Sequence, residues 1–281
     1  MINKLFTPCL AFVCVLGGLS TIFTSSVNAT ALAIMLVAYI LVATLGFYIC
    51  KYLRPLKITK IAVSVWSLLS CSFSVTVAAD LVVRASVLHK DYFPFVVIMT
   101  AAFCVIFALS PRTPVKSVTL VCAGVSLLAF IVIIILSVLD TDFSYPELPS
   151  PTVGDFFPVS LVAILDVFLI FKMSKHKTPI SYLAGGICAF VLLLVITLVS
   201  VSVLSPKTYY SLESPLLKLW QSTYITSFIN RFEIVSVTAL YLITALKAAI
   251  VLRPCLENSN ARLKPVLVIS VFLLCIPFSF L

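Results

Sequence analysis

Residues 180–204 read ISYLAGGICAFVLLLVITLVSVSVL, a run that contains no charged side chain. A helix rises about 1.5 Å per residue, so this run is long enough to cross the roughly 30 Å of bilayer hydrocarbon. Similar runs recur through the chain of 281 residues, of which 62% are hydrophobic and 10% charged. Soluble domains are about half apolar and a quarter charged, and disordered chains are polar. The composition therefore excludes both and predicts an all-α polytopic membrane protein.

Charged and proline-rich turns divide the chain into about nine predicted transmembrane helices. The runs are continuously apolar, whereas the strands of a membrane barrel alternate apolar and polar residues, so helices are expected. No separate soluble domain fits between them, and the chain is expected to form a single transmembrane domain. The predicted spans are 5–23, 29–50, 61–83, 93–110, 116–139, 156–171, 180–204, 232–252 and 265–281.

The loops alternate in basic content in the way that sets membrane orientation. With the N-terminus inside, thirteen Lys and Arg residues fall in inside loops and five in the opposite loops. Inside loops of membrane proteins are rich in Lys and Arg, so the net charge of +9 reports topology and needs no nucleic-acid partner. The inside residues are Lys4, Lys51, Arg54, Lys57, Lys60, Arg112, Lys116, Lys172, Lys175, Lys177, Arg253, Arg262 and Lys264.

Residues 1–29 have two interpretations. Lys4, the apolar run from Leu5 to Leu19 and the small residues near Ala29 are typical of a cleaved secretory signal peptide. The same residues can form a retained first span. We favour the retained span, because the loop that follows is too short to be a translocated domain.

The segment 215–230 is predicted to be an amphipathic helix on the outside. Ser214-Pro215 is typical of an N-cap followed by proline at the first helical position. Apolar residues then recur at helical spacing, and Lys218 lies off that face. Such a helix either anchors the chain in the membrane interface or closes over the helical bundle.

Two ionisable residues lie well inside predicted spans, where a charge is costly and indicates function. Asp166 lies six residues before Lys172 and Lys247 six before Arg253, so each is about 9 Å from the inner end of its helix. Both helices run from outside to inside, so the two charges could meet and compensate each other. Lys247 could instead extend to the inner headgroups. The pair is structural, or it binds substrate or couples proton movement.

Asp80 is a third candidate for substrate binding or proton coupling, although its depth also fits a structural role. It lies about 30 Å along its helix from Lys60, at the outer boundary, and Arg84 follows one turn later. An ion pair at the rim is therefore expected between them. Arg231 and Glu233 are expected to form a second rim pair at the start of the eighth span.

The pair Gly17-Gly18 is a candidate helix break in the first span. Pro158 begins the sixth span, which is the matching position in a five-plus-five inverted repeat. Transporters built in this way interrupt such spans to open backbone groups towards a substrate. Close packing between helices is the other explanation of a glycine pair.

The sequence contains no signature of an enzyme, a metal centre or a cofactor site. It has neither a glycine-rich phosphate loop nor an HExxH motif, and both histidines lie in loops. The nine cysteines show no CxxC spacing and mostly lie in apolar runs, so we interpret them as packing residues.

Residues 214–249 contain three motifs in a fixed order. They are Ser214-Pro215-Leu216-Leu217-Lys218-Leu219-Trp220, then Ile229-Asn230-Arg231-Phe232-Glu233, then an apolar helix that ends Ala245-Leu246-Lys247-Ala248-Ala249. This order resembles the spore-germination permease family, the B subunits of endospore germinant receptors. These subunits are relatives of the amino-acid/polyamine/organocation transporters.

The resemblance implies an inverted-repeat transporter fold with spans one, three, six and eight around the site. Nine spans would make it an incomplete five-plus-five arrangement. It further implies that the chain senses or conducts a small amino-acid-like nutrient, with a germinant-receptor A subunit and a C lipoprotein as partners. The membrane would be the bacterial cell membrane or the inner spore membrane. The alternatives are a non-transporting structural membrane subunit and an ordinary secondary transporter of small solutes.

Overall fold

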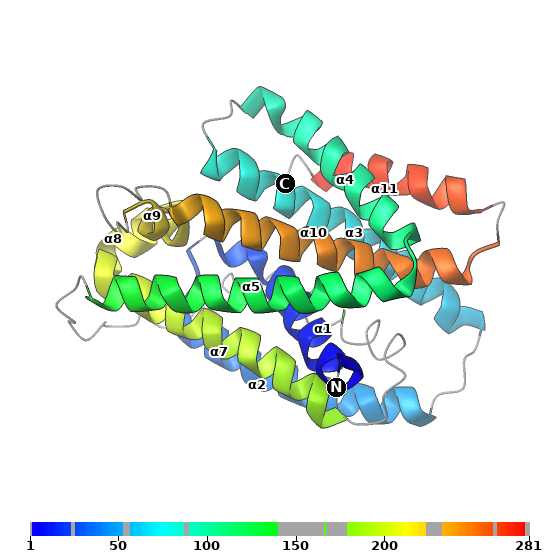
Figure 1. Ribbon diagram of the computed structural model, residues 1–281, viewed down its shortest axis with the longest axis horizontal. Coiled ribbons are helices and arrows are strands. Elements are labelled where there is room, and N and C mark those ends of the chain that lie inside the picture. Colours follow the sequence, from blue (N-terminus) through cyan, green and yellow to red (C-terminus); the bar gives the residue numbers. More distant parts are fainter. Residues whose placement is uncertain are drawn as a thin grey trace.

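The computed structural model describes residues 2–23, 26–52, 57–86, 90–139, 166, 179–222, 232–260 and 263–278, and every regular element among them is helical (Figure 1). The longer helices are α1 (Ile2–Gly18), α2 (Ala29–Tyr52), α3 (Lys57–Ala85), α4 (Phe93–Leu109), α5 (Arg112–Leu139), α7 (Pro179–Leu204), α10 (Phe232–Asn258) and α11 (Lys264–Phe278). The short ones are η1 (Ser20–Phe23), η2 (Lys90–Tyr92), α8 (Pro206–Ser211) and α9 (Pro215–Ser222).

Five of these helices are long and apolar enough to cross a membrane, namely α2, α3, α5, α7 and α10. Three shorter apolar helices, α1, α4 and α11, accompany them. The prediction of a helical, multi-pass membrane protein is confirmed. Nine spans, an inverted repeat and the inside position of the N-terminus stay predictions. The predicted span 156–171 lies outside the described residues except for Asp166.

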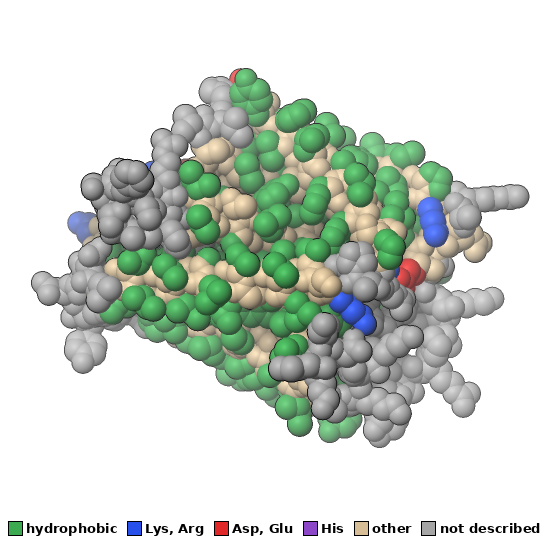
Figure 2. Space-filling model, viewed as in Figure 1, with side chains coloured by type: hydrophobic (Ala, Val, Ile, Leu, Met, Phe, Trp, Pro, Cys, Tyr) green, Lys and Arg blue, Asp and Glu red, His purple; other side chains and the backbone are tan. Residues whose placement is uncertain are grey.

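The surface of the bundle is the part that would contact lipid. Hydrophobic side chains cover the middle of the face seen in Figure 2. On α2, large apolar side chains recur every three or four residues and are each about half exposed, which would be unfavourable in water but suits a bilayer. They are Ile34, Val37, Leu41, Leu45 and Tyr48.

The first helix lies at the centre of the bundle rather than at its edge. Residues 10–20 are buried without exception, and α1 packs against α5, α7 and α10 (Figure 1). The choice between a retained span and a cleaved signal for residues 1–29 stays a prediction.

The chain leaves α-helical geometry at the predicted break. α1 ends at Gly18, and after Leu19 the chain continues as the 3-10 helix η1. The Ser20 hydroxyl donates to the Gly17 carbonyl at 2.8 Å, which satisfies one acceptor at the end of α1. Gly17 also serves close packing, because a Cβ there would lie 2.9 Å from the Cβ of Lys247 on α10. The structure thus shows close packing at Gly17 and a change of helix type directly after the glycine pair. That this change opens backbone groups towards a substrate stays a prediction.

Helix α10 is longer than its apolar run. The predicted span ended at 252 with Arg253 in an inside loop, whereas α10 continues through Pro254 to Asn258. Arg253 is buried, and its Nε donates to Glu257 Oε1 at 2.8 Å, one turn further on. Placing Arg253 in a loop was therefore wrong, because an ion pair within the helix lets the charge stay inside it. Lys247 consequently lies nearer the middle of its helix than its distance from Arg253 indicated.

The short helix α9 packs onto the bundle. Its residues Leu216, Leu217 and Leu219 are at most 4% exposed, whereas Lys218 is exposed. Its neighbours are α7, α10 and η1, so its apolar face covers helices rather than lipid. This arrangement favours the interpretation that residues 215–222 close over the helical bundle, rather than the interpretation that they anchor the chain in the membrane interface. The remainder of the predicted segment, 223–230, lies outside the described residues.

The cysteines contribute to packing. The eight cysteines whose side chains the structure describes are free thiols, and five of them are buried. Cys104 on α4 donates to the Ala245 carbonyl of α10 at 3.2 Å, which joins two helices through a small side chain. The interpretation of the described cysteines as packing residues agrees with these positions.

Glycine packing between α1 and α7 gives a testable prediction. A Cβ at Gly185 would overlap the backbone carbonyl of Pro8 on α1, which cannot rotate away as a side chain could. We expect Gly185→Ala to lower the free energy of unfolding by about 1–3 kcal/mol, as overpacked cores do. Gly124→Ala is the matched control, because a Cβ at Gly124 meets nothing within 4 Å. It should be neutral or stabilising, since alanine favours the helix by about 1 kcal/mol. Thermal unfolding of both variants in the same detergent measures the difference, and equal losses would contradict the packing argument.

Candidate functional site

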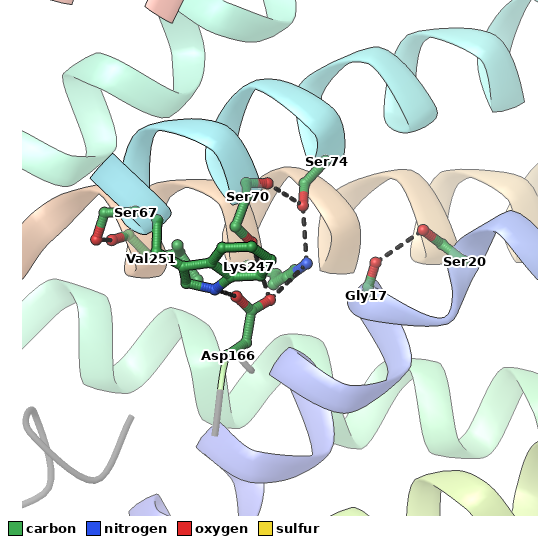
Figure 3. Close-up of polar contacts among 9 residues, drawn as sticks. Gly17, Ser20, Ser67, Ser70, Ser74, Asp166, Lys247 and Val251 are labelled. Carbon is green, nitrogen blue, oxygen red and sulfur yellow. Dashed lines mark hydrogen bonds and ion pairs between the residues drawn. The ribbon is translucent and has the colours of Figure 1, made fainter. Parts of the chain in front are cut away.

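A buried ion pair lies in the interior of the bundle. Lys247 Nζ is 2.8 Å from Asp166 Oδ2, and the two side chains are 0% and 1% exposed (Figure 3). The structure thus brings together the two residues that the depth argument placed at a common level. Lys247 does not extend to the headgroups.

Helix α3 provides the polar contacts around this pair. Trp66 Nε1 donates to Asp166 Oδ1 at 3.1 Å, and Ser70 Oγ donates to Oδ2 at 2.9 Å. Lys247 Nζ donates to Ser74 Oγ at 2.9 Å, and Ser74 Oγ in turn donates to the Ser70 carbonyl. Residues 66, 70 and 74 are four apart, so they lie on one face of α3, the helix against which α10 packs most extensively.

These contacts explain how two charges can be buried. The Asp166 carboxylate accepts hydrogen bonds from an indole and a hydroxyl in addition to its contact with Lys247. Desolvating an ion costs several kcal/mol, which a partner recovers only with good geometry and further hydrogen bonds. Lys247 uses two of the three ammonium donors on these contacts, to Asp166 and Ser74. The pair is therefore well matched in charge and in hydrogen bonding.

The end of α1 lies next to the same pair. A Cβ on Gly17 would approach the Cβ of Lys247 and the backbone of Thr244, so α1 and α10 are in near-backbone contact there. The carboxyl end of a helix carries partial negative charge, which favours the ammonium group of Lys247. Cys14 on α1 and Tyr182 on α7 lie within electrostatic range of Asp166. Helices α1, α3, α7 and α10 thus all contribute to the surroundings of the ion pair.

Asp80 is not part of this group. Arg84 Nε donates to both carboxylate oxygens of Asp80 at 2.7 and 2.8 Å, which is the rim pair expected from the sequence. Arg84 Nη1 also lies 3.6 Å from Oε2 of Glu213, in the connection between α8 and α9. Asp80 follows Ser70 by ten residues, about 15 Å along α3, so the structure separates it from the buried pair. The second rim pair cannot be placed, because Arg231 and the side chain of Glu233 lie outside the described residues.

Sequence reasoning missed Trp66, Ser70 and Ser74. It weighed ionisable residues only, although polar side chains repeating every four positions on an apolar helix indicate a polar face. No group of three His, Cys, Asp or Glu residues in the described ranges could hold a metal ion. No family model matches the sequence, and no curated protein is significantly similar to it.

The ion pair gives a double-mutant prediction. Lys247→Met and Asp166→Asn each leave one charge or polar partner buried without compensation, so each should cost about 3–5 kcal/mol. The double variant should be markedly more stable than the sum of the two losses predicts. Equilibrium unfolding in one lipid–detergent mixture measures this coupling.

The matched control is the exposed pair Asp80–Arg84, whose side chains are 30% and 40% exposed. The cycle with Asp80→Asn and Arg84→Met should give a coupling of only about 0.5 kcal/mol, because solvent screens such pairs. Couplings of equal size in the two cycles would contradict the assignment of Asp166–Lys247 as the central interaction.

Proposed function

We propose that this protein is a permease-like membrane subunit that senses or conducts a small amino-acid-like nutrient, with Asp166 and Lys247 at its binding centre. The observation that carries the proposal is the burial of this complete ion pair among apolar helices. Ionisable residues inside membrane bundles are costly and concentrate on substrate and proton paths. Burying apolar side chains at both positions would stabilise the bundle at least as well.

The chemistry of the pair favours a ligand that carries both signs of charge. A carboxylate can replace Asp166 beside Lys247, and an ammonium group can replace Lys247 beside Asp166. An amino-acid-like molecule can therefore bind between Asp166 and Lys247 without leaving either buried charge uncompensated. The hydroxyls of Ser70 and Ser74 both accept and donate, so they suit either state of the pair.

The position of the pair beside the end of α1 supports the proposal. At Gly17 and Gly18 α1 gives way to the 3-10 helix η1 next to Lys247, and inverted-repeat transporters have broken helices at their binding sites. The short helix α9 lies over η1, which directly follows this break.

The narrower form of the proposal rests on the resemblance of residues 214–249 to the spore-germination permease family. In that form the chain is a germinant-receptor-like subunit that acts in spore germination in the bacterial cell or inner spore membrane. Its partners would be a germinant-receptor A subunit and a C lipoprotein. The competing forms are an ordinary secondary transporter, which would work alone, and a structural membrane subunit, which would have no ligand.

Asp166→Asn tests the role of the buried carboxylate. In proteoliposomes that contain the protein, we expect the amide to abolish uptake of a mixture of radiolabelled amino acids and its response to an inward proton gradient. The physical reason is that an amide neither carries the charge nor exchanges the proton. Asp91→Asn is the control, because it neutralises an exposed carboxylate on η2. Uptake and pH response equal to the unaltered protein would contradict the role of Asp166.

Purification from native membranes distinguishes the competing forms. A receptor subunit should be recovered with stoichiometric companions, including a lipoprotein, and a secondary transporter should be recovered without them. A germination subunit that senses without conducting should bind ligand but show no uptake. Full ligand response in Asp166→Asn/Lys247→Met, with normal assembly, would favour the structural role for this pair.

A further inference from the structure

A second polar site lies at the end of the bundle where α3 terminates. Here Arg84 and the segment from Ser211 into α9 line a cleft of about 420 Å³. Sites for small molecules usually have volumes in this range and combine apolar walls with a few placed charges. The cleft contains both kinds of group, with Leu212 and Leu217 beside Arg84, Glu213 and Lys218.

The charges of this cleft are only loosely matched to each other. Arg84 Nε is held by Asp80, but Nη1 and the Glu213 carboxylate are 3.6 Å apart, longer than a hydrogen bond. The Glu213 side chain is 93% exposed, so water screens this contact and little free energy opposes its opening.

Lys218 adds a second cation to the same wall. It occupies the first turns of α9 between the buried residues Leu217 and Leu219, so its backbone position is fixed by packing. Its side chain is exposed and forms no ion pair with any residue in the described part of the chain. The cleft is thus lined by two cationic groups and one carboxylate, which come from the end of α3, from α9 and from the connection between α8 and α9.

We propose that this cleft binds a zwitterion, a small molecule or headgroup with an anionic group and a primary ammonium group a few ångströms apart. The anionic group would contact Arg84 and Lys218, and the ammonium group would donate to Glu213. A simple anion is opposed by the Glu213 carboxylate, and a simple cation by the two basic residues. Leu212 and Leu217 provide contact for an aliphatic substituent.

Two sources offer this chemistry. One is a free amino acid, and the other is the headgroup of phosphatidylethanolamine, because the end of a spanning helix lies near the headgroups. The site is separate from the buried pair, since Arg84 follows Ser74 by ten residues, about 15 Å along α3. Binding here does not depend on the function proposed for Asp166 and Lys247, and Asp166→Asn should retain it.

Binding to the full chain in nanodiscs of phosphatidylcholine tests the free-ligand source. Radiolabelled L-leucine should bind saturably and should be displaced by unlabelled leucine. It should not be displaced at equal concentration by 4-methylpentanoate, which lacks the ammonium group, or by 3-methylbutylamine, which lacks the carboxylate. Glu213→Gln and Lys218→Met should each weaken binding at least tenfold. Lys207→Met is the matched control, because Lys207 is exposed on α8 but does not line the cleft, and it should leave binding unchanged.

Native mass spectrometry tests the lipid source. If leucine does not bind, the protein should retain phosphatidylethanolamine in preference to phosphatidylcholine, and Glu213→Gln should abolish that preference. The proposal is overturned if neither leucine nor phosphatidylethanolamine binds. It is equally overturned if 4-methylpentanoate competes as well as leucine, which identifies a plain anion site. The Glu213 side chain is 93% exposed, so Glu213→Gln should fold normally, and loss of leucine binding in this variant assigns the binding to the cleft rather than to the buried pair. Leucine binding that Glu213→Gln leaves unchanged overturns the proposal.

Discussion

The arrangement of the bundle depends on one electrostatic requirement, which is that two charges buried among apolar helices must compensate each other. Asp166 and Lys247 meet this requirement at 2.8 Å, and side chains of α3 complete their hydrogen bonds. A lateral or rotational shift of α10 against α3 would separate Lys247 from Ser74 and Asp166 together. The pair therefore fixes the register of these helices more strictly than their apolar contacts, which tolerate sliding. Register specification and ligand recognition are compatible roles, because a ligand that carries both charges preserves the compensation.

Helix α3 connects the two polar regions of the molecule. Its face at Trp66, Ser70 and Ser74 supports the buried pair, and its end at Arg84 forms the wall of the cleft below α9. Between them the α3–α10 interface is filled mainly by small side chains such as Ala79 and Ala245. Small residues let the helix backbones approach closely, which is a common basis of helix association in membranes. Both polar regions are therefore built on one closely packed helix.

The sequence was sufficient for the features that hydrophobicity and charge determine. Long apolar runs predicted the described helices, and the helical rise placed Asp166 and Lys247 at a common depth before any contact was known. The sequence was insufficient for features that depend on a contact formed only in the folded protein. Arg253 reads as a loop residue until its pairing with Glu257 within α10 is seen. Trp66, Ser70 and Ser74 repeat every four positions and so indicate a polar face, but nothing in a single sequence states that this face of α3 meets the acid. The sequence suggested both a helix break and close packing for Gly17-Gly18. Only the position of Lys247 shows that Gly17 packs closely against α10.

The central position of α1 has a consequence for biogenesis. Helix α1 has its final neighbours in α5, α7 and α10, which are synthesised after it. During insertion the buried polar residues Thr7 of α1 and Ser20 of η1 must therefore wait beside lipid or the insertion machinery. Lys247 arrives on the helix that also closes the contact with Gly17. Completion of the core is thus coupled to synthesis of the C-terminal part, and a nascent chain arrested before α10 would expose an unfinished interior to membrane quality control.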